Sequence, residues 1–283
     1  MRHSIFRSYH FLILALTLLI GYAWQVEPRL LHVREVVIRD DAMAQAWQGL
    51  TIVHLSDIHI EREGDREARL LAWIKELQPD LILMSGDYRQ WGRSPVPAQH
   101  FLSQLEAPLG VYGVLGDSDA SVSREGCAYC HPGEQYGERV THPVILRNER
   151  RSLPWHGGEI SLVGIDVGEE GGEWLKAMQA EAEQPGAPLL VLNHGSAPWS
   201  ASPLAMHSLW LVGDTHGGQI LLPKWLWRFI PYKPDPRHMA GLYTNGAGSW
   251  LLVNRGVGQT AWFPFRFGVL PEICVITFTP TND

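Results

Sequence analysis

The chain has 283 residues, which is enough for one large domain or two small ones with a well-buried core. Hydrophobic residues make up 45% and charged residues 19%, which excludes a disordered chain, and three cysteines exclude a disulfide-dense scaffold. The formal net charge of −7 argues against a nucleic-acid partner bound by bulk charge, whereas 13 histidines and 30 acidic residues offer many ligands for metal ions.

The N-terminal segment, residues 1–24, is the first predicted element. Arg2 and Arg7 precede an uncharged apolar run at residues 11–24. Together with the residues from Ile5 onward, this run provides the roughly 20 residues that a helix needs to cross a bilayer. Tyr22 and Trp24 at its outer end suit the membrane interface. We expect a single transmembrane anchor in the cell membrane, with a cleaved signal peptide or a buried core helix as alternatives. Because basic flanks stay in the cytoplasm, the rest of the chain is expected outside it, in the periplasm.

Residues 25–49 are predicted to form a connector with one strand at 35–38, and residues 50–283 to form a single domain. Apolar residues on one helical face indicate a helix at 66–77, which ends before Pro79. Short apolar runs around it predict an α/β domain with mixed sheets, the later strands being antiparallel. The predicted strands are 50–55, 81–84, 111–115, 160–163, 189–192, 209–212, 220–222, 250–253 and 273–276.

Five of the apolar runs end, within two residues, in a turn that carries an acidic residue or a histidine. In an α/β sheet, groups just past the carboxyl ends of the strands meet in one crevice. Asp and Gly are also common in ordinary turns and helix caps, which accounts for one or two such turns but poorly for five. The turns are Ser56–His59, Gly86–Asp87, Gly116–Asp119, Asn193–His194 and Gly213–His216.

Clustered Asp and His side chains are ligands for a borderline-to-hard divalent metal ion. An acidic domain repels phosphate, so a site that acts on phosphate esters needs imported positive charge. Two metal ions about 3.5–4 Å apart would supply that charge and would turn a bridging water into hydroxide.

The ordered series of turns resembles the calcineurin-like metallophosphoesterases, especially their membrane-anchored bacterial branch, over residues 50–279. The resemblance implies a sandwich of two mixed β-sheets flanked by helices and preceded by the N-terminal membrane helix. It also implies a metal-dependent phosphoric ester hydrolase that acts on a phosphate mono- or diester through metal-bound hydroxide. The motifs that carry it are His54–His59, Leu83–Asp87, Tyr112–Asp119, Ile145–Glu149, Asn193–His194, Gly213–Gln219, Val253–Gly258 and Phe265–Glu272.

The same resemblance implies two divalent ions, of Mn, Fe, Mg or Zn. The first would be held by Asp57, His59 and His216, with Asp87 bridging to the second.

The second site departs from the family pattern. Only His194 matches, because family members usually have Asn where this chain has Asp117 and His where it has Asp214. Both changes replace a neutral ligand by an anionic oxygen, which predicts a harder site that favours Mn²⁺, Mg²⁺ or Fe over Zn²⁺. A decayed site that binds one metal or none is the alternative.

Ser118 stands where the family has the histidine that contacts substrate and helps the leaving group to depart, and Asp119 would orient that histidine. A serine hydroxyl is a poor general acid near neutral pH. We therefore expect these two catalytic positions to give reduced monoesterase activity, unless the leaving group departs unaided or His131 or His142 replaces the missing acid.

Residues Cys127, Cys130 and His131 form the Cys-x-x-Cys-His signature of c-type haem attachment. The cysteines would form thioethers and His131 would be the proximal iron ligand. A disulfide or redox pair, half of a zinc site and a chance arrangement are the alternatives. The motif supports a second hypothesis, a redox or sensory protein with covalent haem c and a vestigial ester site. A third hypothesis is a binding module that keeps one structural metal, and Cys274 is expected to be a plain core residue.

Residues 223–234 interleave aromatic side chains such as Trp225 and Trp227 with Lys224, Arg228 and Lys233. This pattern suits a membrane interface or the acyl chains of a lipid substrate, with an aromatic cap over a sheet edge as the alternative. Since the same chain carries the expected anchor, a lipid-linked phosphoester is the preferred substrate class.

Overall fold

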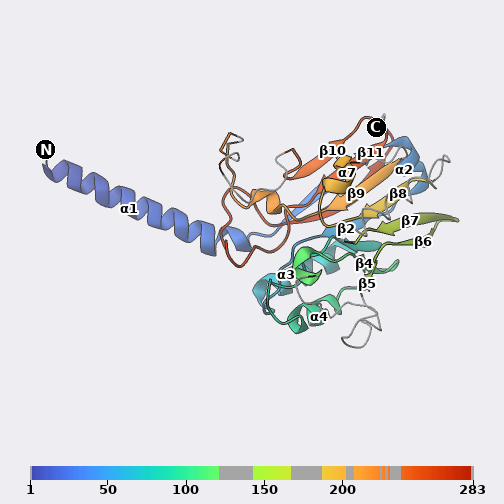
Figure 1. The fold of residues 1–283 in the computed structure, drawn as a ribbon, viewed down its shortest axis with the longest axis horizontal. Helices are drawn as coiled ribbons and strands as arrows, with labels where there is room; N and C mark the ends of the chain where they lie inside the picture. Colours follow the sequence, from blue (N-terminus) through green and yellow to red (C-terminus); the bar gives the residue numbers. More distant parts are fainter. Residues whose placement is uncertain are drawn as a thin grey trace.

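Two six-stranded sheets form the body of the molecule, and one long helix extends from it (Figure 1). The structure is a computed structural model that describes residues 2–120, 143–166, 187–201, 207–223, 225–226, 229 and 237–281. The two sheets are mixed and flanked by helices, so the expected α/β architecture is confirmed.

The long helix is α1, Arg2–Gln25, followed by the 3₁₀ turn η1, Glu27–Arg29. Its apolar side chains are largely exposed, and it projects away from the sheets (Figure 1). Within the part of the chain that the structure describes, it is the one helix long and apolar enough to cross a membrane. The predicted anchor is therefore a candidate span in the structure as well.

The first sheet has the order β1-β12-β2-β3-β4-β5, and its neighbours are parallel except for β12 and β2. Segment 25–49, expected to be a connector, supplies β1 and the helix α2, Asp41–Ala46. Strand β1 pairs with β12 along its whole length, so this segment is part of the sheet. The strands of this sheet are β1 (His32–Arg39), β2 (Ile52–Leu55), β3 (Leu81–Met84), β4 (Val111–Gly113), β5 (Val144–Ile145) and β12 (Glu272–Thr279).

The second sheet has the order β10-β11-β9-β8-β7-β6. Its four inner strands are parallel to one another, and the two edge strands β10 and β6 are antiparallel to their neighbours. The strands are β6 (Glu149–Trp155), β7 (Gly158–Gly164), β8 (Leu189–Leu192), β9 (Ser208–Val212), β10 (Gly241–Thr244) and β11 (Ser249–Val253).

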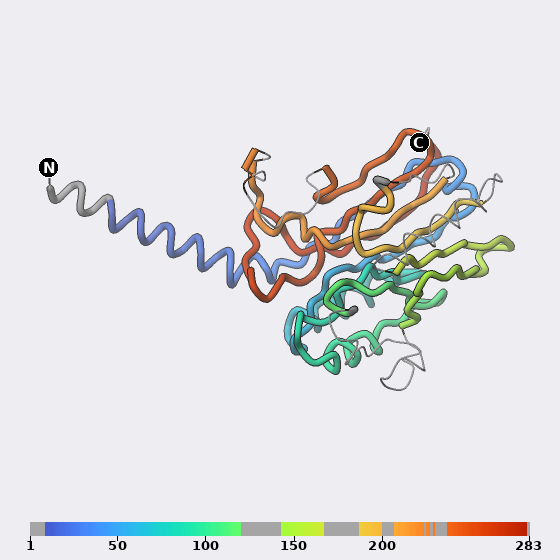
Figure 2. Tube along the Cα trace, viewed as in Figure 1, coloured from blue at the N-terminus to red at the C-terminus, as the bar shows by residue number. Residues whose placement is uncertain are grey.

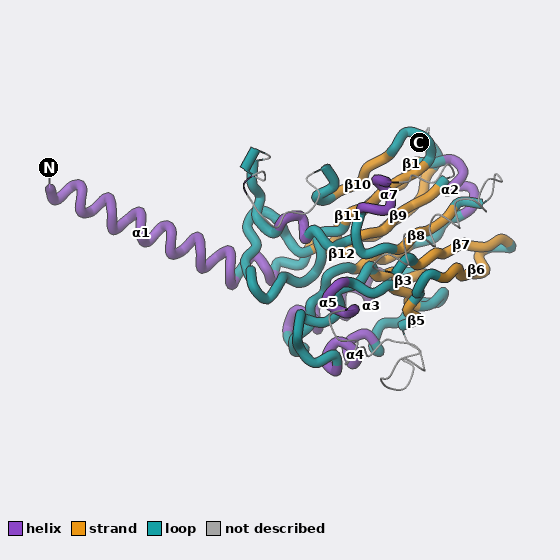
Figure 3. Tube along the Cα trace, viewed as in Figure 1, coloured by secondary structure: helices purple, strands orange, loops and turns teal. Residues whose placement is uncertain are grey.

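Apolar side chains fill the space between the sheets and both outer faces, as continuous apolar strands require. The inner cluster joins residues such as Leu83 of the first sheet with Leu211 of the second. On the outer side of the first sheet, α3 (Asp65–Leu77) and α4 (Val96–Leu102) cover a second cluster, and Figure 3 shows both helices on that side. The short helix α7, Ala197–Ala201, packs Trp199 on the outer face of the second sheet.

The structure corrects two expectations about the later strands. Residues 220–222 form no strand, only an isolated bridge from Ile220 to Phe267, because Gly217, Gly218 and Gln219 all have positive φ and turn the chain. The later strands are also not uniformly antiparallel, since β12 runs parallel to β1 and β11 runs parallel to β9. Strand β10 was not predicted, because its half-buried sequence has no continuous apolar run.

Candidate metal centre

The predicted ligands come together where strands of both sheets end. Strands β2, β3 and β4 of the first sheet lead into the turns with Asp57, Asp87 and Asp117, and β8 and β9 of the second lead into those with His194 and His216. The expected convergence of carboxyl ends thus involves both sheets of the sandwich.

The first ligand group consists of Asp57, His59 and His216. One potential ligand atom from each lies within 4.8 Å of the others, and all three residues are buried. The Nε2 atoms of His59 and His216 are 3.1 Å apart, and His216 Nε2 is 3.4 Å from Asp57 Oδ1. Two imidazole nitrogens and a carboxylate aimed at one point can hold a divalent ion.

The second ligand group consists of Asp57, Asp87 and His194, again with ligand atoms within 4.8 Å of one another. His194 Nε2 lies 3.7 Å from Asp87 Oδ1 and 3.9 Å from both Asp117 Oδ1 and Asp214 Oδ1. The side chains of Asp117 and Asp214 are 64% and 50% exposed, so this group faces solvent on their side.

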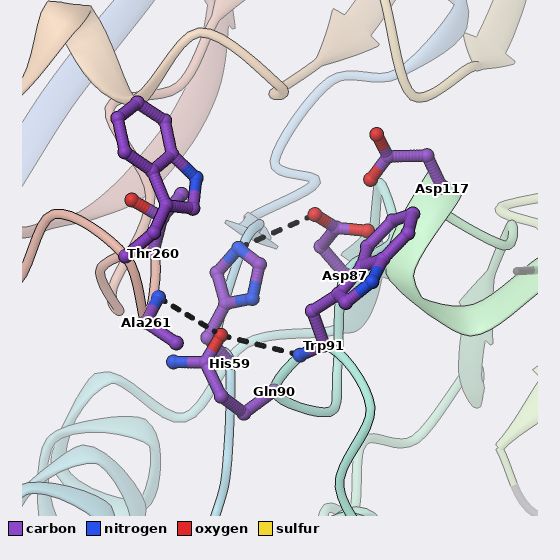
Figure 4. A pocket seen from close by; sticks show the side chains of 8 residues that line it. His59, Asp87, Gln90, Trp91, Asp117, Thr260 and Ala261 are labelled. Atoms are coloured by element: carbon purple, nitrogen blue, oxygen red, sulfur yellow. Dashed lines mark hydrogen bonds and ion pairs between the residues drawn. The ribbon is translucent and has the colours of Figure 1, made fainter.

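Asp57 belongs to both groups, and Asp87 of the second group also contacts the first. Oδ2 of Asp87 lies 3.2 Å from His59 Nε2, while its Oδ1 faces His194 at 3.7 Å. One carboxylate therefore presents an oxygen to a histidine of each group, which is the geometry that a bridging ligand needs. Figure 4 shows the Asp87 carboxylate beside the His59 ring.

Backbone strain accompanies this arrangement. Left-handed φ values are uncommon for residues other than glycine and cluster at functional sites, where the surrounding fold must enforce them. Five predicted ligands have φ between 48° and 70°: Asp57, His59, Asp87, Asp214 and His216.

His194 tests whether the site fits a metal ion. Its Nδ1 lies 2.7 Å from the carbonyl oxygen of Ser85 and donates to it, which turns Nε2 toward the carboxylates. That Nε2 is buried and has no hydrogen-bond partner among the described residues. A buried polar atom without a partner is costly, whereas a metal ion would satisfy it, and the carbonyl is the usual support of a ligating histidine. The residues present therefore fit the ion.

The negative charges of the cluster shift the pKa values of its members. Burial lowers the pKa of His194, but the charges of Asp87, Asp57 and Asp214 outweigh it and raise the value to about 10. Burial and the charge of Asp87 raise the pKa of both Asp57 and Asp117 to about 6. Burial also lowers the pKa of His216 well below its usual range, so that imidazole is neutral. The cluster holds more negative charge than it can neutralise, which favours cations.

Ser118 contacts the ligand cluster through Asp87. It is fully buried, and both its backbone N–H and its Oγ contact Asp87 Oδ1, at 2.9 and 2.8 Å. Ser118 thus supports Asp87 and holds a donor on the oxygen that faces His194.

Asp119 holds two turns together. Its carboxylate accepts hydrogen bonds from the backbone N–H groups of Tyr88, Arg89 and Gly116. Burial and the charge of Asp87 raise its pKa to about 7. These hydrogen bonds join the turn after β3 to the turn after β4.

A chain of buried donors behind Asp57 was not predicted. His54 Nε2 lies 3.0 Å from Ser85 Oγ, Ser85 Oγ donates to Ser56 Oγ, and Ser56 Oγ donates to Asp57 Oδ2. The sequence does carry a signal, since His54 lies in the apolar strand β2 and Ser56 and Ser85 directly follow β2 and β3. The predicted metal ligands next to these residues drew the interpretation instead.

A pocket opens beside the first ligand group (Figure 4). It includes three predicted ligands and five residues that the sequence did not mark as functional, because no motif distinguishes them from ordinary loop residues. The lining residues are His59, Asp87, Asp117, Gln90, Trp91, Thr260, Ala261 and Trp262.

Several predictions fall outside the described residues. The haem motif of Cys127, Cys130 and His131 lies there, as do His142 and most of the aromatic stretch 223–234. Trp225 and Phe229 of that stretch are described and are exposed. Cys274 is fully buried in the core between the sheets, which confirms its structural role.

Comparison with known proteins adds one family match and three relatives to the geometry. A family model described as calcineurin-like phosphoesterase matches residues 50–217. The chain is 28% identical to the uncharacterized metallophosphoesterase YkuE of Bacillus subtilis, over 93% of this chain and 90% of the relative. It is 25% identical to the UDP-2,3-diacylglucosamine pyrophosphatase LpxG of Chlamydia trachomatis, over 90% and 91% of the two chains. It is 26% identical to the phosphodiesterase YaeI of Escherichia coli, also over 90% and 91%.

Proposed function

Because the chain belongs to the calcineurin-like phosphoesterase family, we propose that it hydrolyses a lipid-linked phosphate mono- or diester at the membrane, with two divalent metal ions. The family supports a phosphoester hydrolase that uses divalent ions. The carboxylate of Asp87 is the observation that carries the two-metal proposal, since its oxygens face His59 and His194 separately.

The proposed ligands divide between two adjoining positions. Asp57, His59 and His216 hold the first ion, and Asp87 reaches both. The second position combines His194 with the half-exposed carboxylates of Asp117 and Asp214, a set rich in anionic oxygen. Such a set suits Mn²⁺, Mg²⁺ or Fe better than Zn²⁺.

When bound, the two ions neutralise the phosphoryl oxygens and lower the pKa of water, which supplies the nucleophile. The chain's own residues fix the geometry. Ser118 holds Oδ1 of Asp87 with two donors, and the carbonyl of Ser85 holds the ring of His194. The Ser56 hydroxyl donates a hydrogen bond to Oδ2 of Asp57.

No proton donor is proposed at Ser118. The family's histidine would reach the substrate from this position, but the serine side chain is fully buried and bonded to Asp87. The chain is therefore proposed to favour esters whose leaving group departs without protonation, and to hydrolyse alkyl monoesters slowly.

Two observations support a membrane substrate. The helix α1 is long and apolar enough to cross a membrane, and as a span it would tie the domain to the bilayer. The Chlamydia trachomatis relative is named for a diacylated sugar nucleotide, so the substrate named for that protein carries acyl groups. The proposed location of the domain is the periplasmic side, because Arg2 and Arg7 flank the start of the span.

The test is a hydrolysis panel on the purified full chain, loaded in turn with Mn²⁺, Fe²⁺, Mg²⁺ and Zn²⁺. We expect metal-dependent release of nitrophenol from bis-p-nitrophenyl phosphate and slower release of phosphate from alkyl monoesters. A His194→Ala variant is expected to lose most of the activity, because it removes a proposed ligand of the second ion. The absence of metal-dependent hydrolysis with every ion would refute the proposal.

Covalent haem c remains the alternative proposal, and it is supported only by the motif at Cys127, Cys130 and His131. Expression together with haem-attachment machinery tests it directly. A Soret band that survives denaturation would support attachment, and its absence would exclude it.

A further inference from the structure

Residues 254–271, which we call the rim loop, join strand β11 to strand β12 and lie beside the end of α1 (Figures 1 and 2). On one side, Thr260, Ala261 and Trp262 line the pocket. On the other, the backbone N–H of Arg266 donates to the carbonyl of Ala23 at 2.9 Å. The same loop therefore contacts both the candidate membrane span and the candidate metal centre.

Further contacts strengthen the attachment to the helix. The N–H of Val269 donates to the side chain of Glu27 at 2.8 Å, and the ring of Phe267 packs edge-on against Tyr22, with centroids 6.5 Å apart. The rim loop is thereby fixed to the C-terminal end of the candidate span and to the turn that follows it.

Two glutamine side chains hold the pocket side of the rim loop in place. Gln90 donates to the carbonyl of Gln259 and accepts from the N–H groups of Ala261 and Trp91 (Figure 4). Gln219 accepts from the N–H of Thr260 and donates to the carbonyl of Phe263. These contacts make the wall of the pocket a preorganised surface.

This fixed wall presents large apolar side chains to solvent. Trp262 is 77% exposed and Trp91 is 50% exposed, although both line the pocket beside His59 and Asp87. Leaving an indole exposed to water gives up the favourable free energy that its burial would provide. Exposed apolar groups around a pocket are therefore typical of a ligand-binding site. The two tryptophans adjoin the place where a phosphoryl group would bind.

Exposed apolar residues continue from the pocket wall toward the membrane span. Phe267 and Leu221 are 38% and 70% exposed, and the N–H of Leu221 donates to the carbonyl of Phe267. Tyr22 and Trp24 at the end of α1 are 38% and 51% exposed. An alkyl chain that leaves the bilayer beside α1 would meet apolar side chains along the rim loop as far as the pocket.

We propose that Trp91 and Trp262 form a subsite that receives the alkyl or acyl portion of a membrane-derived phosphoester and so determines specificity for apolar esters. The proposal rests on the proposed function, because it assumes that a phosphoryl group binds at the metal centre. Exposed apolar residues on both the pocket side and the α1 side of the rim loop favour a chain over a planar base.

The test measures binding, so that it does not depend on turnover. Methyl-, butyl- and hexylphosphonate are titrated calorimetrically into the Mn²⁺-loaded full chain in lipid nanodiscs. We expect Kd to fall about two- to fourfold for each added methylene, as burial of alkyl surface predicts. In a Trp91→Ala/Trp262→Ala double variant this dependence on chain length should vanish, while the affinity for methylphosphonate stays unchanged.

Matched variants separate the subsite from general effects. Trp155→Ala removes a tryptophan on the edge strand β6 and should keep the full dependence, and Trp91→Phe/Trp262→Phe should restore most of it. An unchanged slope in the double Ala variant, a flat series in the wild type, or no phosphonate binding at all would overturn the proposal. Preference for a nucleoside phosphonate that is lost in the double variant would overturn it in favour of a base-stacking site. A Trp-dependent slope without hydrolysis of any ester would keep the subsite and refute the phosphoesterase.

Discussion

One carboxylate oxygen of Asp87 lies 3.2 Å from His59 Nε2, and the other lies 3.7 Å from His194 Nε2. The backbone N–H and the hydroxyl of Ser118 both donate to Asp87. The two residues therefore differ in what they contribute, although they are in direct contact. Asp87 supplies a charge that both proposed ions share, whereas Ser118 fixes the direction of that charge. Substitution can separate these roles.

Asp87→Asn is expected to lower hydrolysis of bis-p-nitrophenyl phosphate at least about 100-fold, because the amide cannot bridge two cations as an anion. Ser118→Ala should cost about tenfold, since it removes one of two donors to an intact carboxylate. Steady-state kinetics with saturating Mn²⁺ measure both, and circular dichroism shows whether each variant folds. Equal losses in the two variants would contradict the division of roles.

The carboxylates of Asp117 and Asp214 beside His194 predict which metal ion the second site prefers. Asp117 and Asp214 replace neutral family ligands, and both carboxylates lie 3.9 Å from His194 Nε2. An Asp117→Asn/Asp214→His double variant should shift the competition between Zn²⁺ and Mn²⁺ at least about tenfold toward Zn²⁺, because imidazole is a softer ligand than carboxylate and neither new side chain carries a charge. Equilibrium dialysis against both ions measures the ratio. A ratio equal to that of the wild type would show that these residues do not contact the ion.

Metal binding should also release protons. A group is protonated below its pKa, so His194, at about 10, carries a proton at pH 7 that an ion must displace. At pH 5, Asp57 and Asp117, both at about 6, are largely protonated too and must also lose protons. Calorimetry of Mn²⁺ binding in buffers of different ionisation enthalpy should show proton release that increases from pH 7 to pH 5, with affinity falling in parallel. Release that does not change with pH would contradict this assignment.

At the scale of the elements, the short turns after the strands decide whether the ligands meet. Continuous apolar runs predicted β3 and β8 at their observed bounds, and the turns after them predicted Asp87 and His194 as neighbours in space. Residues that act by contact with backbone gave no such signal. The position of Ser118 under Asp87 depends on the left-handed turn at Asp87, which a sequence pattern does not reveal.

Close approach of two turns accounts for a glycine after β9. A Cβ on Gly213 would lie 1.8 Å from Ser56 Oγ and 2.2 Å from Asp57 Oδ2, closer than any real contact. Gly213→Ala is therefore expected to displace Asp57, abolish binding of the first ion and lower the melting temperature by several degrees. Gly158→Ala serves as the control, since its Cβ would meet only one backbone oxygen at 3.6 Å. Normal metal content in the Gly213 variant would show that the two turns can separate without loss of the site.

At the scale of the whole molecule, one chain combines a candidate membrane span with a two-sheet hydrolase fold. The long uncharged run predicted the span, and the buried strands predicted an α/β domain with mixed sheets, while the family resemblance implied the two-sheet hydrolase fold. It did not predict that β1 would complete the first sheet or that the rim loop would attach to the end of α1. Both depend on pairing between residues more than 200 positions apart, such as Arg266 with Ala23, for which neither segment carries a local signal.

The basic residues at the start of α1 predict the orientation of the chain. A C-terminal fusion to alkaline phosphatase should be active, and a fusion to a green fluorescent protein that folds only in the cytoplasm should be dark. Moving the positive charge, by Arg2→Glu/Arg7→Glu together with basic residues after α1, should reverse or mix the two readouts. In the wild type, an inactive phosphatase fusion together with a fluorescent green fluorescent protein fusion would place the domain in the cytoplasm.

We propose that the fold assembles two adjacent metal sites that share Asp87. The most direct test is the metal content of the full chain after loading with Mn²⁺ and removal of free ion, measured by inductively coupled plasma mass spectrometry. We expect two ions per chain in the wild type, one after His194→Ala, and fewer than one after Asp87→Asn. One ion or none in a folded wild-type chain would contradict this proposal, as would two ions retained without Asp87.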